Sequence, residues 1–497
     1  MTTRPAPRYD CFAIAAPGLE ALVAHELLTL GVPEATAVPG GVEFTADAAR
    51  LAAVQLRIRT ATRVVVRLAQ FRATAFHELE RAARQVEWGR ILPAGARFRL
   101  RVTCRKSRLY HSDAVAERIA GAIVKKVEGA LYEVGRVLED DRDDSNDEPL
   151  DGATLSDPTT TGASTTDATG GATAAVLAAA PEPEAPELRG AQGTGKGFNP
   201  WAAASRKFAS KKVAAAEAAE EAASARARRP RTDEPKPVPK AVASVRAAAR
   251  KPGELPAQLF VVRFDHDVCT ISADASGELL HRRGYRLAVG RAPLRETLAA
   301  AMLIACEWEP SMPLVDPMCG SGTIAIEAAM IARRIAPGRA RPFAAETWPE
   351  TPAGLWKAER LVAEQEILPA GAAPIIGADR DEGAIANARA NATRAGVLGD
   401  VEFRCAAVSA LEVPEAPRGL LAANPPYGVR VGESRPLRDL FARLGQVARA
   451  KCAGWRVALL SADRALDAQT ALPFTEVFAT SNGGIAVRLV AADVPAA

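Results

Sequence analysis

A glycine-rich stretch in the C-terminal half, residues 316–323 with the sequence DPMCGSGT, has the composition of a ligand-binding turn. Gly320 and Gly322 lack a Cβ atom, so their backbone can approach a ligand closely, and the helix expected after them offers unpaired N–H groups. A nucleoside triphosphate is disfavoured because a Walker loop requires a lysine, and none follows Gly322. Asp379 ends the next strand-like segment, where its carboxylate can accept both hydroxyl hydrogens of a ribose. These features fit S-adenosylmethionine; the alternative is a tight turn in which Asp316 caps the helix and Asp379 is a simple turn residue.

A second stretch, residues 424–428 with the sequence NPPYG, follows another apolar run. An exocyclic amine of a nucleobase is a poor nucleophile, because its lone pair is delocalised into the ring. The side-chain oxygen of Asn424 and the carbonyl of Pro425 can accept the two amine hydrogens, which directs the lone pair towards a methyl donor. Pro426 stiffens the backbone, and Tyr427 offers a stacking face for a base drawn out of its surroundings. The two stretches together predict methyl transfer to a nucleobase amine, whereas the second alone also fits a proline-rich turn.

The composition is that of an ordinary globular protein, with 48% hydrophobic and 25% charged residues. Its 63 basic and 59 acidic residues leave a formal net charge of +4, so affinity for nucleic acid has to come from local clusters. Seven cysteines are scattered without metal-binding spacing, and the chain has no run of about eighteen apolar residues. We therefore expect a reduced cytoplasmic protein with neither a metal site nor a membrane segment.

The C-terminal part, residues 276–497, alternates strand-like and helical patterns. Apolar runs end in polar residues at 314–316, 374–379 and 420–424, and the segment 476–490 predicts a hairpin around an Asn-Gly-Gly turn. Alternating strands and helices favour a parallel sheet whose ligands bind at the carboxyl ends of the strands. We expect an α/β fold with a Rossmann-like parallel sheet and a terminal antiparallel hairpin.

Residues 136–256 differ abruptly from the rest of the chain. They contain an acidic block, a Thr/Ala/Gly stretch and a Lys/Arg/Ala-rich tract, and they almost lack aromatic and branched apolar residues. Ordering such a segment costs backbone entropy without forming a core. We interpret it as a disordered low-complexity insert whose basic half can add nonspecific affinity for RNA.

The chain resembles the THUMP-containing class I RNA guanine-N2 methyltransferases, which include the bacterial enzyme for large-subunit ribosomal RNA and transfer-RNA enzymes. The resemblance is carried by the two stretches above and by residues 281–286 (HRRGYR), 292–299 (APLRETLA), 16–20 (APGLE), 59–63 (RTATR) and 104–112 (CRKSRLYHS). It implies an N-terminal ferredoxin-like module at 8–70, a THUMP RNA-binding module at 71–135 and 257–275, and a methyltransferase domain at 276–497.

The resemblance also implies site residues. For S-adenosylmethionine they are Asp316, Met318, Cys319, Gly320, Gly322, Thr323, Asp379, Ser409 and Asn424. For the guanine amine they are Asn424, Pro425, Pro426 and Tyr427. The segment around Arg295 is expected beside the methionine end of the cofactor. The family usually has an acidic residue near the adenine after Phe403, whereas this chain has Ala407 nearby, so backbone groups or Ser409 are expected to hold the adenine.

Basic residues gather in one short region. They are Arg97, Arg99, Arg101, Arg105, Lys106 and Arg108, with Tyr110 and His111 following. Phosphate neutralisation with adjacent stacking is one interpretation, and a solvated, charged edge strand is the other. Arg282, Arg283 and Arg286 are expected to bridge RNA and the catalytic cleft.

Four functions remain open. The resemblance favours N2-methylguanosine formation in large-subunit ribosomal RNA, followed by transfer RNA. A DNA adenine-N6 methyltransferase is the nearest competitor, because the sequence NPPY serves that amine too, but the resemblance of the N-terminal part to RNA-binding modules argues against it. Methylation of a pyrimidine ring carbon needs a nucleophilic cysteine, and Cys452 lacks such a setting. The fourth function is an RNA-binding assembly factor with a silent site.

Overall fold

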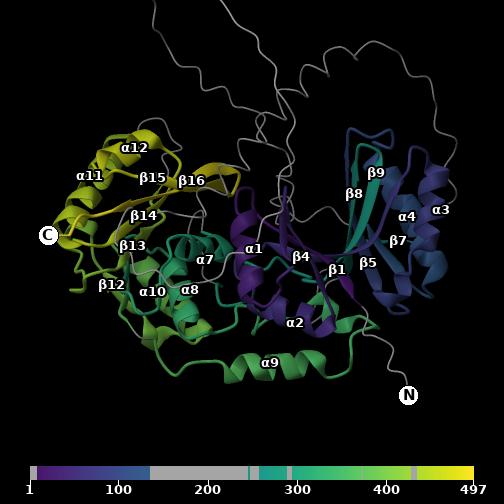
Figure 1. Cartoon of the computed structure of the whole chain (residues 1–497), viewed down its shortest axis with the longest axis horizontal. Helices are drawn as coiled ribbons and strands as arrows, with labels where there is room; N and C mark the ends of the chain where they lie inside the picture. The colour runs from purple at the N-terminus through teal and green to yellow at the C-terminus, as the bar shows by residue number, and fades with distance from the viewer. Residues whose placement is uncertain are drawn as a thin grey trace, which may run out of the picture.

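The computed structural model describes residues 8–134, 244–246, 257–287, 294–371, 373–426 and 434–496. These residues form two sheets, one of nine strands and one of seven. Figure 1 shows the two sheets in opposite halves of an elongated molecule, with helix α9 (Leu355–Gln365) running beneath α2 (Ala48–Arg57). The seven-stranded half contains the glycine-rich stretch 316–323 and residues 424–426 of the second stretch.

The C-terminal sheet has the strand order β12-β11-β10-β13-β14-β16-β15. Its strands are β10 (Leu314–Asp316), β11 (Ile375–Asp379), β12 (Glu402–Cys405), β13 (Leu420–Ala423), β14 (Arg456–Ser461), β15 (Thr475–Asn482) and β16 (Ile485–Asp493). Strands β10 to β14 are parallel, whereas β16 pairs antiparallel with both β14 and β15. The predicted parallel sheet with a terminal hairpin is therefore confirmed.

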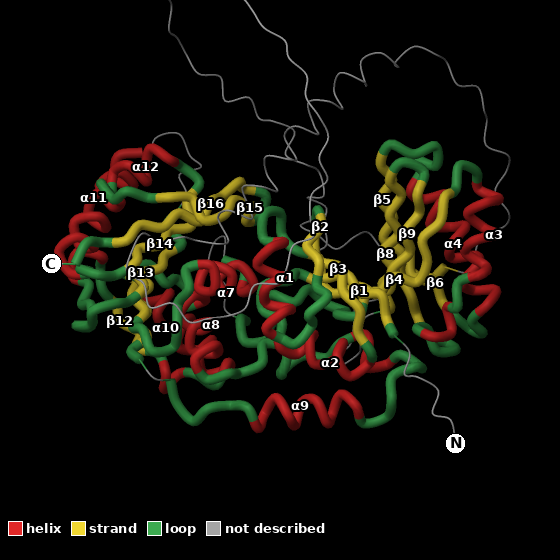
Figure 2. Tube along the Cα trace, in the orientation of Figure 1, coloured by secondary structure: helices red, strands yellow, loops and turns green. Residues whose placement is uncertain are grey.

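Helices cover both faces of this sheet (Figure 2). They are α7 (Glu296–Ala305), α8 (Thr323–Ala332), α10 (Glu382–Ala395), α11 (Ser434–Lys451) and α12 (Arg464–Gln469). Leu314 and Val315 are neighbours in β10 but belong to separate cores, because successive side chains of a strand point to opposite faces. Leu314 packs with α7, α8 and α10, and Val315 packs with α11 and α12.

The N-terminal sheet has the strand order β2-β3-β1-β4-β9-β8-β5-β6-β7. Its strands are β1 (Tyr9–Ile14), β2 (Thr36–Val38), β3 (Gly41–Ala46), β4 (Arg63–Arg72), β5 (Arg97–Arg105), β6 (Leu131–Val134), β7 (Ser244–Arg246), β8 (Gln258–Asp265) and β9 (Val268–Asp274). The helices of this half, besides α2, are α1 (Glu20–Thr29), α3 (Phe76–Gln85) and α4 (Ser112–Lys126). Strand β4 joins the ferredoxin-like and THUMP parts, because it pairs with β1 on one side and with β9 on the other. The two expected modules thus share one continuous sheet.

Two predictions for this half need correction. Strand β7 lies within the segment 136–256 and pairs in parallel with β6, so the prediction of disorder is wrong for its three residues. The rest of 136–256 lies outside the described residues. Strand β5 lies between β8 and β6, but β6 pairs only with Arg97 and Phe98, so the edge-strand interpretation is wrong for this first end of the strand.

A cluster of buried charged groups joins the two halves. Glu327 on α8 is fully buried, and its Oε1 accepts a hydrogen bond from the Tyr285 hydroxyl at 3.1 Å. Arg283 Nε lies 3.5 Å from the same oxygen, and Arg59 Nη1 from the N-terminal half lies 3.9 Å from Oε2. Burial lowers the pKa of Arg59, and Glu327 opposes that shift. In this cluster, two positively charged arginines and one negatively charged glutamate therefore lie together, shielded from water.

The expected RNA-bridging role of Arg283 and Arg286 does not agree with their positions. Arg283 is buried, and its guanidinium donates to the carbonyl oxygens of Leu280 and Arg59, at 2.6 Å each. Arg286 Nη2 lies 3.0 Å from Oε2 of the buried Glu296. Arg283 therefore helps to hold the two halves together, whereas Arg286 pairs within the C-terminal half with the first residue of α7.

Candidate active site

Three predicted polar residues lie at the carboxyl ends of adjacent parallel strands. Asp316 ends β10, Asp379 ends β11, and Asn424 directly follows β13. Strand β10 pairs with β11 on one side and with β13 on the other. Neighbouring strands lie about 4.8 Å apart, so the three backbone positions share one short edge of the sheet.

The glycine-rich turn after β10 has the backbone that its sequence predicts. Gly320 and Gly322 have φ of 51° and 85°, in the left-handed region that side chains disfavour. A Cβ on Gly322 would lie 3.0 Å from Ala388 Cβ and 3.1 Å from Phe403 Cε1, so this glycine is required for packing. A Cβ on Gly320 would meet nothing within 4 Å, which leaves open space above the turn. The turn therefore has room for a ligand at Gly320.

Asp379 ties this turn to the neighbouring strand. Its Oδ2 accepts a hydrogen bond from Gly320 N at 2.9 Å, and its Oδ1 accepts one from Asp381 N at 3.0 Å. Each carboxylate oxygen can accept a second hydrogen bond. Asp381 has a different task, because its own Oδ1 accepts from Ala384 N and caps α10. Asp379 is thus a fixed acceptor beside the open space above Gly320.

Asp316 is a buried carboxyl group at the base of the turn. Its Oδ1 accepts a hydrogen bond from Met318 N at 3.2 Å. Burial raises the pKa of Asp316 to about 8, the Met318 N–H opposes this shift, and the charge of Asp379 adds to it. The alternative in which Asp316 caps the helix is wrong, because Gly322 is the N-cap of α8 and no side chain caps that helix. A cationic ligand would favour the ionised form of this group.

Asn424 is half-buried, Pro425 is buried and Pro426 is exposed. Tyr427 lies outside the described residues. Ser409 is exposed in a short 3-10 helix (Val408–Ala410) after β12, the strand that pairs with β11. The structure thus brings the predicted adenine-side residue to the same edge as Asp379.

Two buried thiols are unsuited to nucleophilic attack. Burial raises the pKa of Cys319 well above its usual value, and burial raises that of Cys452 to about 11. Only the thiolate is an effective nucleophile, and neither environment favours it. These raised pKa values argue against methylation of a pyrimidine ring carbon, which needs a nucleophilic cysteine. All seven cysteines are free.

One residue that positions the glycine-rich turn was not predicted from the sequence. Asn391 on α10 donates from Nδ2 to the carbonyl oxygen of Ser321 at 3.1 Å, so it holds the glycine-rich turn from the helix side. It is buried on the same helix as Ile385, Ala388 and Ala392. In the sequence, the signal for this role was a single amide residue among the apolar positions of the helix.

Two negative findings apply to the described ranges of the chain. There, histidine, cysteine, aspartate and glutamate side chains form no group of three or more that could hold a metal ion. The helices in those ranges are each too short or too polar to span a bilayer.

The parallel sheet, the glycine-rich turn at the end of its central strand and the antiparallel last strand define a class I methyltransferase domain. Comparison with known families gives the same assignment. Residues 283–490 match the RMKL-like methyltransferase domain, residues 10–65 match the RlmL ferredoxin-like domain, and residues 73–134 match the THUMP domain. The chain therefore contains a ferredoxin-like domain, a THUMP domain and a methyltransferase domain, in that order.

Curated relatives share part of this chain. A Synechocystis protein with a provisional assignment as an RNA methyltransferase is 37% identical over 223 residues, which cover 45% of this chain and 58% of that protein. The ribosomal RNA large subunit methyltransferase K/L of Legionella pneumophila strain Lens is 39% identical over 250 residues, which cover 49% of this chain and 35% of that protein. The chain thus spans little more than half of the first relative and about a third of the second.

Solved structures resemble the chain over nearly its whole length. A Listeria monocytogenes protein described as a predicted N6-adenine-specific DNA methylase has 26% identity and a TM-score of 0.67, and the match covers 98% of this chain and 97% of that one. SMU.472, a protein provisionally assigned as a methyltransferase and solved with S-adenosylhomocysteine, has 23% identity, a TM-score of 0.68 and 99% coverage of both chains. The latter likeness concerns the fold alone.

Proposed function

We propose that this protein transfers a methyl group from S-adenosylmethionine to N2 of a guanine in RNA, with large-subunit ribosomal RNA as the substrate and the cytoplasm as the place of action. The observation that supports this most directly is the position of Asn424 and Pro425 directly after β13, beside the strand that leads into the glycine-rich turn. An amide oxygen and a carbonyl at that edge suit an exocyclic amine.

The residues at the edge fit the cofactor. Bound there, S-adenosylmethionine supplies a methyl group activated by a sulfonium charge. The open space above Gly320 and the uncapped N-terminus of α8 suit the methionine part, and the buried carboxyl of Asp316 suits its positive charges. Asp379 is the candidate acceptor for the ribose hydroxyls, and Ser409 or backbone groups after β12 are candidates for the adenine. The proposed cofactor site also includes Met318, Cys319 and Thr323.

Residues of the chain act on the amine by orienting it. We assign the two amine hydrogens of guanine to two acceptors, the Asn424 side-chain oxygen and the Pro425 carbonyl. These two hydrogen bonds turn the nitrogen lone pair towards the methyl group. Positive charge develops on the nitrogen during transfer, and these oxygens stabilise it without prior removal of a proton. Tyr427 is proposed to stack on the base.

The RNA-binding role is assigned to the THUMP domain. Arg105, Lys106 and Arg108 are exposed at the end of β5 and in the turn that follows, and Tyr110 is also exposed, with its ring centroid 4.0 Å from that of His111. Exposed cations beside aromatic rings suit phosphates and unstacked bases. Arg97 is less suited, because it pairs with Glu133 at 3.1 Å.

Mass spectrometry of nucleosides tests the substrate. Ribosomal and transfer RNA from cells lacking the protein are digested, and N2-methylguanosine is quantified in each fraction. Loss of N2-methylguanosine from large-subunit ribosomal RNA alone agrees with the proposal. Loss from transfer RNA alone would show that transfer RNA is the substrate. The structural likeness to a protein described as a DNA methylase makes DNA adenine-N6 methylation the second candidate. Methyl transfer to duplex DNA but not to RNA would establish that alternative.

Removal of the Asp379 carboxylate is expected to weaken binding of S-adenosylmethionine. Asp379→Ala loses an acceptor for the ribose hydroxyls and the acceptor for Gly320 N, which corresponds to roughly a ten- to hundredfold loss of affinity. Isothermal titration calorimetry gives the affinity. Asp381→Ala is the matched control, because that carboxylate caps α10, and its loss costs about 1 kcal/mol of stability and not affinity. Equal affinities in parent and Asp379→Ala would contradict the assignment.

Affinity for the cofactor is also expected to depend on pH through Asp316. The free protein holds a proton on this group below its pKa of about 8, and a cationic ligand expels that proton. Affinity therefore rises with pH, by up to about tenfold per unit between roughly pH 6 and pH 7.5. Asp316→Asn is expected to bind more weakly and with little pH dependence over this range. Parallel pH profiles for the two proteins would show that another group titrates.

A further inference from the structure

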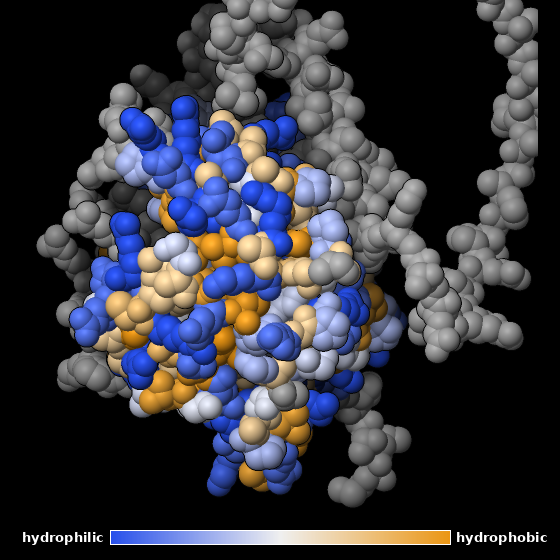
Figure 3. Space-filling model, turned by 90° about the vertical axis from the view of Figure 1, so that its left-hand side faces the viewer, coloured by the Kyte–Doolittle hydropathy of each residue, from blue (hydrophilic) through white to orange (hydrophobic). Residues whose placement is uncertain are grey.

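Helix α11 concentrates positive charge in one short part of the chain. Its 18 residues include five basic residues and one acidic residue, so this helix alone has the formal net charge of +4 that the whole chain has. Figure 3 shows the end of the molecule on which α11 lies, with hydrophilic residues predominating over its upper part. Such a local cluster can attract a negatively charged partner even though the protein as a whole is nearly neutral.

Two of the five basic residues have a structural role. Arg449 Nη1 donates a hydrogen bond to the carbonyl oxygen of Thr470, and Lys451 Nζ donates one to the carbonyl oxygen of Leu411 at 2.6 Å. Both residues lie in the last turn of α11, where the negative end of the helix dipole favours cations. These two positive charges are therefore explained by the fold.

The other three, Arg435, Arg438 and Arg443, form an exposed arginine face on α11. Among the described residues, none of the three has a hydrogen bond or an ion pair from its side chain. Arg435 and Arg438 lie in the first two turns, where the positive end of the helix dipole disfavours cations, and the first turn has no acidic residue. Their positions thus oppose the stability of the helix, which points to a role outside it.

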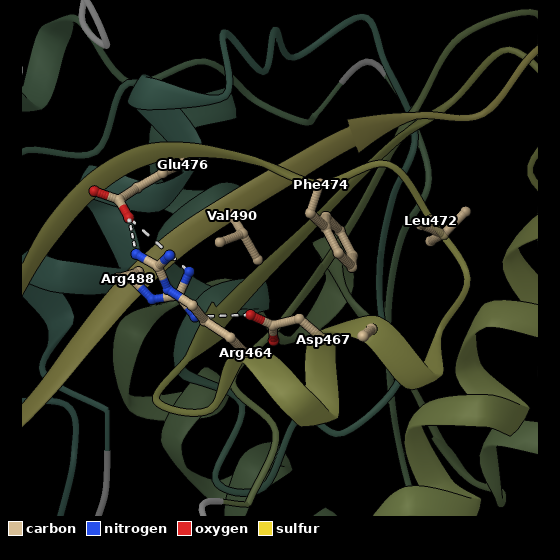
Figure 4. Close-up of a pocket in the computed structure, with 8 residues that line it drawn as sticks. Arg464, Asp467, Leu472, Phe474, Glu476, Arg488 and Val490 are labelled. Atoms are coloured by element: carbon tan, nitrogen blue, oxygen red, sulfur yellow. Dashed lines mark hydrogen bonds and ion pairs between the residues drawn. The ribbon is translucent and has the colours of Figure 1, made fainter. Parts of the chain in front are cut away.

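The arginines of the neighbouring cavity differ, because they face carboxylates. This cavity of about 370 Å³ lies between α12 and the hairpin of β15 and β16 (Figure 4). Arg488 Nη2 contacts Asp467 Oδ2 at 2.8 Å, and Arg464 Nη2 lies 3.8 Å from Glu476 Oε2. Positive and negative groups alternate there, so the cavity has no comparable excess of positive charge.

Helix α11 begins at the edge that holds the proposed amine site. It leads from the carboxyl end of β13 to the amino end of the parallel strand β14, so its first turns lie at the carboxyl edge of the sheet. Its apolar side chains, among them Phe441 and Leu444, share a core with Leu421 and Ala423 of β13. At 1.5 Å per residue the helix is about 27 Å long, roughly twice the length of β13, so its start projects beyond that strand.

We propose that the arginine face of α11 binds phosphate groups of the RNA strand next to the methylated nucleotide. Phosphates supply the negative charge that the first turns of α11 lack, and guanidinium groups bind them through paired hydrogen bonds. The strand that carries a base held at Asn424 leaves the site at the edge where α11 begins. Contacts to phosphates position RNA without selecting its sequence. This inference rests on the proposed function, because it adds a substrate contact to the same enzyme.

Binding of single-stranded RNA tests this surface without turnover. The probe is a fluorescently labelled RNA of mixed sequence, titrated with the full-length protein and S-adenosylhomocysteine at several salt concentrations. We expect Arg435→Ala/Arg438→Ala to bind roughly tenfold more weakly at low salt. The slope of log affinity against log salt concentration should become shallower by about 1 to 1.5, because each lost phosphate contact removes about 0.7. Arg435→Lys/Arg438→Lys should keep most of the slope, since the charges remain.

A second double variant controls for the change in net charge. Arg334 and Arg418 are also exposed, but they lie at the opposite edge of the sheet, since Arg334 follows α8 and Arg418 precedes β13. Arg334→Ala/Arg418→Ala removes the same charge and should bind RNA as the parent does. Equal affinities and salt slopes in the two double alanine variants would overturn the proposal, even if RNA methylation is intact.

Thermal stability separates RNA binding from a structural role. Because Arg435 and Arg438 lie at the positive end of the helix dipole, their replacement by alanine should leave the melting temperature unchanged or slightly raised. Affinity for S-adenosylmethionine should not change. A lowered melting temperature together with an unchanged salt slope would show that the two arginines serve the fold and would contradict the proposal. Absence of methylation on every RNA would refute the proposed function separately, since the binding assay needs no turnover.

Discussion

Asn424→Ala is expected to lower the turnover number roughly a hundredfold, which corresponds to about 3 kcal/mol of lost transition-state stabilisation. The side-chain oxygen at the end of β13 is assigned to a hydrogen of the guanine amine, whose acidity increases as the nitrogen takes on positive charge. The contact therefore strengthens during methyl transfer. Single-turnover kinetics with saturating S-adenosylmethionine measure the chemical step directly.

The companion variant Asn424→Asp keeps an acceptor at the same position. We expect it to retain more turnover than Asn424→Ala, because the oxygen that meets the amine remains. Affinity for S-adenosylmethionine should change little in either variant. Unchanged turnover in Asn424→Ala would exclude the proposed contact, and equal losses in both variants would indicate a role for the amide nitrogen.

Glu327→Ala is expected to destabilise the protein by about 3 to 5 kcal/mol, a fall of roughly 10 °C in melting temperature. The change leaves Arg283 and Arg59 without their buried counter-charge and the Tyr285 hydroxyl without its acceptor. A buried charge that loses its partner is costly, because neither water nor another group replaces the contact. Differential scanning calorimetry measures the shift.

Glu364 on α9 provides the control for this variant. It also faces an arginine, Arg339 at 3.9 Å, but its side chain is 63% exposed. Glu364→Ala should therefore change stability by less than about 1 kcal/mol. Glu327→Gln should fall between the two, since it keeps the acceptor for the Tyr285 hydroxyl but loses the charge. A melting temperature for Glu327→Ala close to that of Glu364→Ala would show that the cluster contributes little.

The edge that holds the proposed site was predictable because it follows from local patterns. Polar residues at 316, 379 and 424 each end an apolar run, and alternating strands and helices bring such ends together. Gly322 was predictable for the same reason, since a strand-to-helix turn with positive φ favours glycine. Short-range sequence thus determined this part of the fold.

Other features depend on contacts between residues far apart in the chain. Arg283 has the sequence context of an RNA-binding arginine, and only its burial against Glu327 shows a structural role. The pairing of β5 with β8, and of β4 with β9, joins segments that no local pattern connects. The interior position of β5 therefore could not be read from its alternating arginines.

The shared nine-stranded sheet has a consequence for how the protein forms during synthesis. Strands β4 and β5 leave the ribosome early, but their neighbours β9 and β8 are encoded after the long segment 106–257. At about 5 to 20 residues per second, translation of that segment takes on the order of ten seconds or more. During this interval the free sides of β4 and β5 expose unpaired backbone groups, which is a known hazard for aggregation. Chaperones that bind nascent chains should thus associate with this protein mainly between the emergence of β4 and that of β9.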